Sequence, residues 1–268
     1  MVDFDDVLGC LELQRLGEGR YTAPNIPMPY RRVFGGQLLA QAIAVAAAAA
    51  EGKSPKSIHV SFPREGDLAK PVEYRVQRLQ EGRSFASLWI EARQGETSIL
   101  GALVSLHAEE PGLSHQLDAP EVGTPEDAAP VDLSMIPWET RMVGGVDLAS
   151  DAVGPPSLEL WMRAPALPDD PVIHQALFAY ASDLTLIGTA LRPHEGVSEA
   201  HVHEKIATAV TTHTVWFHRP LRMDDWILVA QESPTAAGAR GFGLGHAYSR
   251  DGVLVASFGQ ESLIRPLG

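Results

Sequence analysis

The chain has 268 residues, of which 45% are hydrophobic, a formal net charge of −13 and a single cysteine. This profile is typical of a globular protein with one large core or two small ones. The acidic balance argues against a nucleic-acid partner, and one cysteine excludes a disulfide within the chain. The acidic start lacks the features of a signal peptide, and no apolar run reaches the roughly 18–20 residues that span a bilayer. We therefore expect a cytoplasmic protein without membrane insertion.

The first half of the chain predicts two helices followed by strands. Apolar side chains share one helical face over residues 4–13, whereas prolines mark residues 20–30 as a loop. After Gly35 and Gly36, an alanine-rich apolar run continues to Ala50 and predicts a buried helix of about 16 residues. Patterns typical of strands follow at 59–62, 72–77, 85–92 and 98–107. A helix followed by antiparallel strands indicates an α+β unit.

The second half repeats this pattern. An apolar helical segment over 172–191 precedes strand patterns at 210–217, 226–232, 242–249 and 253–264. Landmarks also recur in order: Phe62-Pro-Arg64 with Phe217-His-Arg219, Gly82–Phe85 with Ala239–Phe242, and the turn at Gly95 with that at Gly252. Such a long period suits two similar domains. We predict domains at 1–112 and 156–268, a connector at 113–155, and in each domain a central helix wrapped by a curved antiparallel sheet, as in a double hotdog.

Several motifs resemble those of the acyl-CoA thioesterase II family. They are Arg32-Val-Phe-Gly-Gly-Gln37, Ala181-Ser-Asp183-Leu184, Trp216-Phe-His-Arg-Pro220 and Asp251–Ser257. The similarity runs from about Phe4 to Arg265 and is weakest in the connector. The resemblance implies a double hotdog fold, acyl-CoA as substrate, hydrolysis to free acid and CoA, and assembly as a homo-oligomer. It implies no cofactor.

Asp183 is the first candidate catalytic residue. On a single helix over 172–191 it lies in a stripe that is apolar apart from the hydroxyl of Tyr180. Desolvation there would raise its pKa toward that of a general base. The alternative is that Ser182 or Asp183 caps a second helix that begins at Leu184. The resemblance favours catalysis.

Gln260 is the second candidate. It shares one face of the last strand with apolar side chains, among them Phe258 and Ile264. Its amide can donate to a bound water and accept from it, although an amide that serves the backbone of an edge strand is the alternative. The resemblance implies that the family's water-orienting glutamine stands at this position.

The family's third polar residue is a Thr or Ser early in the strand before Trp216. Counted back from Trp216, this position holds Val210, which departs from the pattern. Thr212 would share the face of Val210 at a distance of roughly 7 Å, and a slip of one residue would bring Thr211 there instead. Either hydroxyl could substitute, or the site is incomplete.

Substrate binding has its own candidates. Gly35 and Gly36 could present backbone N–H groups to an acyl carbonyl or a phosphate, or they relieve crowding between helix and sheet. Arg64 and Arg219 stand in the repeated landmarks and are candidate partners for the phosphates of CoA, against the alternative that each is a solvated surface charge.

Other functions stay open at this point. His201 and His203 invite a zinc site, but no cysteine joins them and their spacing is loose, so we expect no metal. An enoyl-CoA hydratase-like enzyme would need an Asp/His pair, for which His174 is a candidate partner of Asp183. An acyl-CoA-binding protein with little or no hydrolysis is the third hypothesis, and Val210 motivates it.

Overall fold

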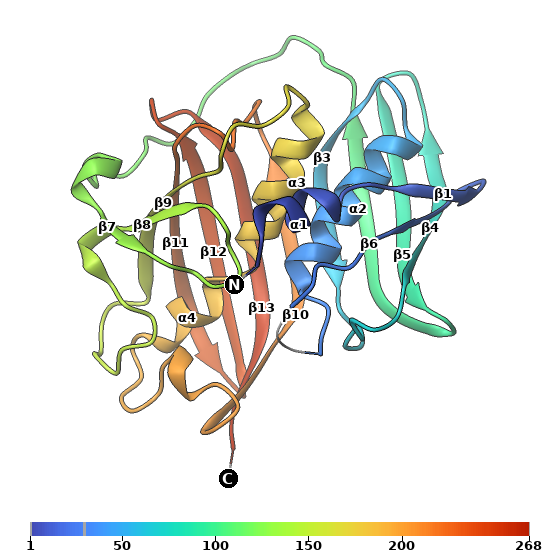
Figure 1. The fold of residues 1–268 in the computed structure, drawn as a ribbon. Helices are drawn as coiled ribbons and strands as arrows, with labels where there is room; N and C mark the ends of the chain where they lie inside the picture. Colours follow the sequence, from blue (N-terminus) through green and yellow to red (C-terminus); the bar gives the residue numbers. More distant parts are fainter. Residues whose placement is uncertain (1, 29–30, 268) are drawn as a thin grey trace.

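One curved antiparallel sheet runs through the whole molecule (Figure 1). The computed structural model describes residues 2–28 and 31–267, and within these ranges the sheet has 13 strands. In sheet order they are β1 (Gln14–Gly17), β2 (Arg20–Ala23), β4 (Val72–Glu81), β5 (Phe85–Gln94), β6 (Thr97–His107), β3 (Ser54–Ser61), β10 (Ile206–Phe217), β13 (Leu254–Pro266), β12 (Arg240–Ser249), β11 (Ile227–Ala237), β9 (Ser157–Arg163), β8 (Glu139–Met142) and β7 (Ala129–Val131).

The strand order is that of two repeats that meet edge to edge. From the junction outward, β3, β6, β5, β4 and β2 on one side correspond to β10, β13, β12, β11 and β9 on the other. At the junction β3 and β10 are antiparallel, with Val60 opposite His213 and Ile58 opposite Val215. The predicted duplication and the double hotdog arrangement are therefore confirmed.

The helices are α1 (Phe4–Gly9), α2 (Gly35–Ala49), α3 (Pro171–Ser182) and α4 (Leu186–Leu191), with short 3₁₀ turns at Pro125–Asp127, Val143–Gly145 and Glu199–His201. The apolar run after Gly36 forms α2, as predicted, and α2 packs against α3 at the centre of the molecule (Figure 1). The two helices run in opposite directions, since the start of α2 contacts the end of α3. None of the helices in the described ranges is long and apolar enough to cross a membrane.

The prediction of one helix over residues 172–191 is wrong. α3 ends at Ser182, and Asp183 is its C-cap residue. The Ser182 hydroxyl lies within hydrogen-bonding distance of the Ala179 carbonyl oxygen (2.9 Å), a local bond that competes with continued helix. After this break the chain changes direction, and α4 packs on β11 and β12 while α3 packs on α2. The break places a polar pair, Ser182 and Asp183, at the end of a buried helix.

The segment 113–155 does more than connect. It supplies β7 and β8, which extend the sheet beyond β9 (Figure 1, green). Ile136 and Trp138 are buried, and the Tyr180 hydroxyl donates to the Met135 carbonyl at 2.7 Å, so this segment also packs on α3. Its low periodicity hid these strands because both are short, and β7 forms the edge of the sheet. The prediction of loop over residues 20–30 is wrong for Arg20–Ala23, which form β2, and is confirmed for residues 24–28; residues 29 and 30 lie outside the described residues.

Candidate active site

Asp183 lies at the point where the two central helices meet. It follows α3, and the first turn of α2 crosses directly beside it. Only 4% of Asp183 is exposed. Burial raises the pKa of this carboxyl to about 7, and a hydrogen bond from the Gly36 N–H opposes the rise only in part. A carboxyl with this pKa is partly ionised at neutral pH and can exchange a proton there.

Gly35 and Gly36 permit this close approach. A Cβ atom on Gly35 would lie 2.6 Å from Oδ2 of Asp183, and a Cβ atom on Gly36 would lie 2.3 Å from the Tyr180 carbonyl oxygen. A side chain at Gly36 would therefore meet the backbone of α3 and push the helices apart, whereas one at Gly35 would displace the carboxylate of Asp183. The predicted relief of crowding therefore applies, and the freed space also lets the Gly36 N–H reach Asp183. A contact of these N–H groups with an acyl carbonyl or a phosphate stays a prediction.

The second carboxylate oxygen of Asp183 faces a histidine. Its Oδ1 lies 3.9 Å from Nδ1 of His213, too far for a hydrogen bond. Oδ1 is buried and accepts no hydrogen bond from the part of the chain that the structure describes. A buried acceptor of this kind is costly unless a small donor such as water satisfies it. Oδ1 is thus free to accept a hydrogen bond from a reactant.

Gln260 joins the same cluster through His213. The two residues are paired across β10 and β13, and the Gln260 Oε1 lies 2.9 Å from His213 Nδ1. On its other side, Gln260 Nε2 donates to the Ser262 hydroxyl at 3.0 Å, and His213 Nε2 lies 2.9 Å from the Ser182 hydroxyl. One imidazole nitrogen therefore lies between the carboxylate of Asp183 and the amide of Gln260, the two candidate residues.

The predicted position of the third hydroxyl needs a correction. A bulge in β10 leaves Thr211 as an extra residue, so Val210 pairs with Ser262 while Thr212 pairs with Glu261. The bulge reverses the alternation, and Thr212 is exposed rather than on the face of Val210. The Thr211 hydroxyl donates to the Glu261 backbone carbonyl at 2.9 Å. Neither threonine hydroxyl is directed at Asp183, whereas Ser262, opposite Val210, brings a buried hydroxyl to the cluster.

The two candidate arginines lie at opposite ends of the β3–β10 junction. Arg64 is exposed on the loop after β3, and the Phe62 N–H in that loop donates to the Thr211 carbonyl at 3.0 Å. Arg219 lies beyond the other end of β10, about 20 Å from His213 by strand rise. Its guanidinium donates to three acceptors: Leu254 O, Ser114 Oγ and His115 O. This geometry indicates that Arg219 anchors the connector to β13.

His174 does not pair with Asp183. It lies nine residues earlier on α3, about 14 Å away by helical rise. Its Nδ1 accepts a hydrogen bond from the Met223 N–H at 3.0 Å. The Asp/His pair suggested for a hydratase is therefore absent in the form predicted. Across residues 2–28 and 31–267, no three His, Cys, Asp or Glu side chains are grouped as metal ligands.

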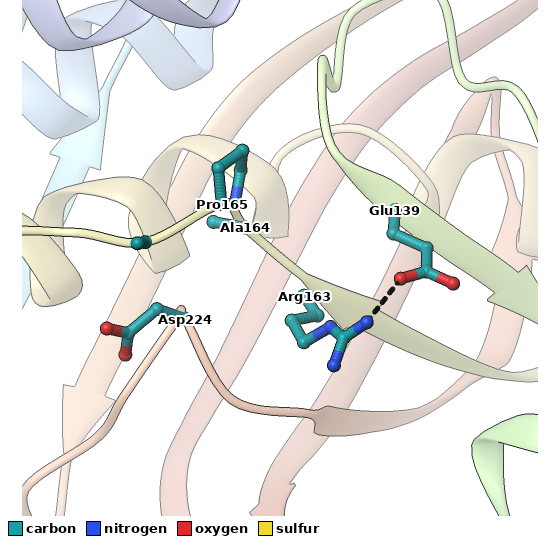
Figure 2. Close-up of a pocket in the computed structure, with 6 residues that line it drawn as sticks. Glu139, Arg163, Ala164, Pro165 and Asp224 are labelled. Carbon is teal, nitrogen blue, oxygen red and sulfur yellow. Dashed lines mark hydrogen bonds and ion pairs between the residues drawn. The ribbon is translucent and has the colours of Figure 1, made fainter.

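A separate pocket lies at the far edge of the sheet (Figure 2). It has a volume of about 430 Å³ and is lined by Glu139, Arg163, Ala164, Pro165, Ala166 and Asp224. Arg163 is paired with Glu139 at 2.8 Å, and Asp224 with Arg222 at 2.9 Å. None of the residues around Asp183 lines it. Its charged groups already have partners, so the cluster around Asp183 is the better candidate for chemistry.

His213, Ser182 and Ser262 are the residues that the sequence interpretation missed. Each had a signal in the sequence. Ser182 lies inside a motif that carried the resemblance, His213 lies three residues before another such motif, and Ser262 shares a strand face with Gln260. The pairing of β10 with β13 brings His213 and Ser262 together, and the end of α3 adds Ser182.

Comparison with known proteins shows which family this chain resembles over most of its length. Residues 23–107 match a family model described as "Acyl-CoA thioesterase N-terminal domain", and residues 153–263 match one described as "Acyl-CoA thioesterase". The chain is 32% identical to "Acyl-CoA thioesterase 2" of Haemophilus influenzae, over 97% of both chains. It is 31% identical to human "Acyl-coenzyme A thioesterase 8", over 95% of this chain and 87% of that protein. Among solved structures, the tesB protein of Mycobacterium avium subs paratuberculosis is 32% identical, with a TM-score of 0.85 over 98% of this chain and 100% of that one.

Proposed function

Because this chain belongs to the acyl-CoA thioesterase family, we infer that it hydrolyses acyl-CoA to a free acid and CoA, and we propose that Asp183 and Gln260 orient the attacking water. The observation that carries the proposal is the buried carboxylate of Asp183, whose Oδ1 has no donor among the described residues and lies beside the His213–Gln260 pair.

The proposed reaction begins with a water that donates a hydrogen bond to Oδ1 of Asp183. The raised pKa, about 7, suits a general base at neutral pH. As the water oxygen bonds to the thioester carbon, its proton passes to Asp183 and a tetrahedral oxyanion forms. Collapse of this intermediate breaks the carbon–sulfur bond. The CoA thiolate leaves and takes up a proton, and Asp183 returns to its ionised form.

Gln260 is suited to hold the water in position for attack on the thioester carbon. One of its two amide N–H groups donates to Ser262, so the other is available for the water or the oxyanion. The start of α2 lies on the opposite side of Asp183, where the N–H groups of a first helical turn favour negative charge. Donors on two sides of the carbonyl would lower the barrier by stabilising the oxyanion.

We propose Arg64 as a partner of the CoA phosphates. Its support is its exposure on the loop after β3, which a backbone hydrogen bond links to β10 two residues before His213. An exposed guanidinium at the rim can pair with phosphate while the thioester reaches the buried carboxylate.

Three broader expectations also remain proposals. The family resemblance favours a homo-oligomer, which light scattering on the purified protein would test. A cytoplasmic location is open to cell fractionation. The division into domains 1–112 and 156–268 with a connector at 113–155 is open to limited proteolysis between the two repeats.

Release of free thiol from a series of acyl-CoA substrates tests the proposed chemistry. We expect the substitution Asp183→Asn to lower kcat by about 100-fold or more, and Gln260→Ala by a smaller factor. Asp251→Asn, an exposed carboxylate in the turn before β13, is the matched control and should retain full activity.

Three outcomes would overturn the proposal. Full thiol release by the Asp183→Asn protein would remove the carboxylate from the chemistry. Hydration of an enoyl-CoA without thiol release would favour the hydratase, and tight acyl-CoA binding without turnover would favour the binding protein.

A further inference from the structure

His213 is the most enclosed polar side chain of the site, and the proposed chemistry does not use it. Its exposed fraction is 0%, and its ring stacks on Phe258 with 6.2 Å between the ring centres and 23° between the planes. A buried imidazole needs partners for both nitrogens. Here both partners are side chains of the site, Gln260 at Nδ1 and Ser182 at Nε2.

The orientation of the Gln260 amide and the place of the imidazole proton depend on each other. With the amide oriented as in this structure, Oε1 can only accept, so the Nδ1 that faces it carries the proton. Nε2 then becomes an acceptor, and the Ser182 hydroxyl, 2.9 Å away, is the donor within reach. That hydroxyl can otherwise donate to the Ala179 carbonyl, also at 2.9 Å. The proton of Ser182 is therefore coupled to the tautomer of His213.

The tautomer in turn selects one of two orientations of the amide. With the proton on Nδ1, Oε1 of Gln260 faces the imidazole, and Nε2 faces Ser262 and the site. With the proton on Nε2, Nδ1 would accept, and the amide could rotate by half a turn and exchange its oxygen and nitrogen. The second orientation would present a carbonyl where the first presents an N–H donor, which would repel the oxyanion instead of stabilising it.

We propose that His213 is a positioning residue, which through the chain Ser182–His213–Gln260–Ser262 keeps the N–H of Gln260 directed at the reacting groups. This inference rests on the proposed thioesterase function. His213 acts on the reaction only by way of Gln260.

A direct role of His213 in proton transfer fits the geometry poorly. Both of its nitrogens are occupied, and the distance of 3.9 Å from Nδ1 to Asp183 Oδ1 is too long for a hydrogen bond. Burial also lowers the pKa of His213 to about 4, so the ring is neutral when Asp183 is ready to act as a base.

The test is a double-substitution cycle with Gln260, read by kcat and KM for thiol release. His213→Leu removes the donor to Oε1, and we expect kcat to fall about tenfold with KM unchanged within twofold, the effect of one lost hydrogen bond. His213→Asn can place an amide N–H at the position of Nδ1, and it should recover kcat to within about threefold of the unsubstituted protein. In a Gln260→Ala background, His213→Leu should cost no more than a further twofold, because its target is gone.

The controls separate positioning from structural damage and from failure of the proposed function. Thermal unfolding shows which variants are folded. If His213→Leu is not folded, Ser182→Ala takes its place, because it removes the hydroxyl that favours one tautomer of His213 and leaves the imidazole ring in position. The positioning role would be overturned if the losses in kcat multiply in the double variant, or if His213→Asn and His213→Leu lose equal kcat, provided that Asp183→Asn is inactive. Full activity of Asp183→Asn would instead overturn the proposed function, and this inference with it.

Discussion

Replacing Asp183 by asparagine should change how the stability of the protein depends on pH. The pKa of this carboxyl is about 7 in the folded protein against 3.8 in an unfolded chain, because burial penalises the charge. The folded protein therefore holds this proton more tightly than the unfolded chain. The resulting stability is fully present below pH 3.8 and is lost as the pH rises through 7.

The size of the effect follows from the same two values. Each pKa unit corresponds to about 1.4 kcal/mol, so the whole difference amounts to roughly 4 kcal/mol of unfolding free energy. Between pH 6 and pH 8, where the folded protein gives up the proton, we expect the unfolding free energy to fall by about 1.4 kcal/mol. An asparagine side chain does not titrate, so this component is missing from the Asp183→Asn variant.

Urea unfolding of both proteins at pH 6, 7 and 8 measures this difference. Other buried groups titrate as well, among them Glu199, whose pKa burial raises to about 7, and His174 and His213, whose pKa values burial lowers. These groups are present in both proteins, so their contributions cancel in the comparison. The cost of an unpaired amide N–H in the variant does not depend on pH, so it does not affect the difference between the two pH dependences. Parallel pH dependences for the two proteins would refute a raised pKa at Asp183, and with it the general base.

Three further outcomes are expected. The value of kcat/KM should fall about tenfold per pH unit below pH 7 and level off above it, since Asp183 must be ionised to accept a proton; a flat profile from pH 5.5 to 8 would contradict this. Gly35→Ala should lower kcat at least tenfold and destabilise the fold by about 1–3 kcal/mol, because its Cβ would lie 2.6 Å from the Asp183 carboxylate. Gly9→Ala is the control, since Gly9 has open space around it, and it should change neither kcat nor stability in the same assays. Arg64→Ala should raise KM severalfold with an effect that weakens at high salt, while Arg219→Ala should leave KM unchanged and lower the melting temperature; the reverse pattern would exchange their roles.

Local pattern was sufficient for much of the fold. The apolar run behind Gly36 could only be a buried helix, and β4, β5 and β6 follow from alternation along the chain. The recurrence of landmarks in the two halves predicted the duplication. These features depend on neighbours in sequence, which explains why they were accessible. Short strands such as β7 and β8 were missed because they take their stability from the strands beside them.

The sequence, through its resemblance to a known family, singled out Asp183 and Gln260 as candidates before any contact was known. Only the tertiary structure decided which groups surround them. The bulge at Thr211 turned Thr212 to the outer face, and the end of α3 at Ser182 placed Asp183 against the start of α2. His213 entered through its pairing with Gln260, 47 residues further along the chain. The physical reason is that strand register, helix ends and desolvation depend on groups distant in sequence, whereas periodicity reports only on near neighbours.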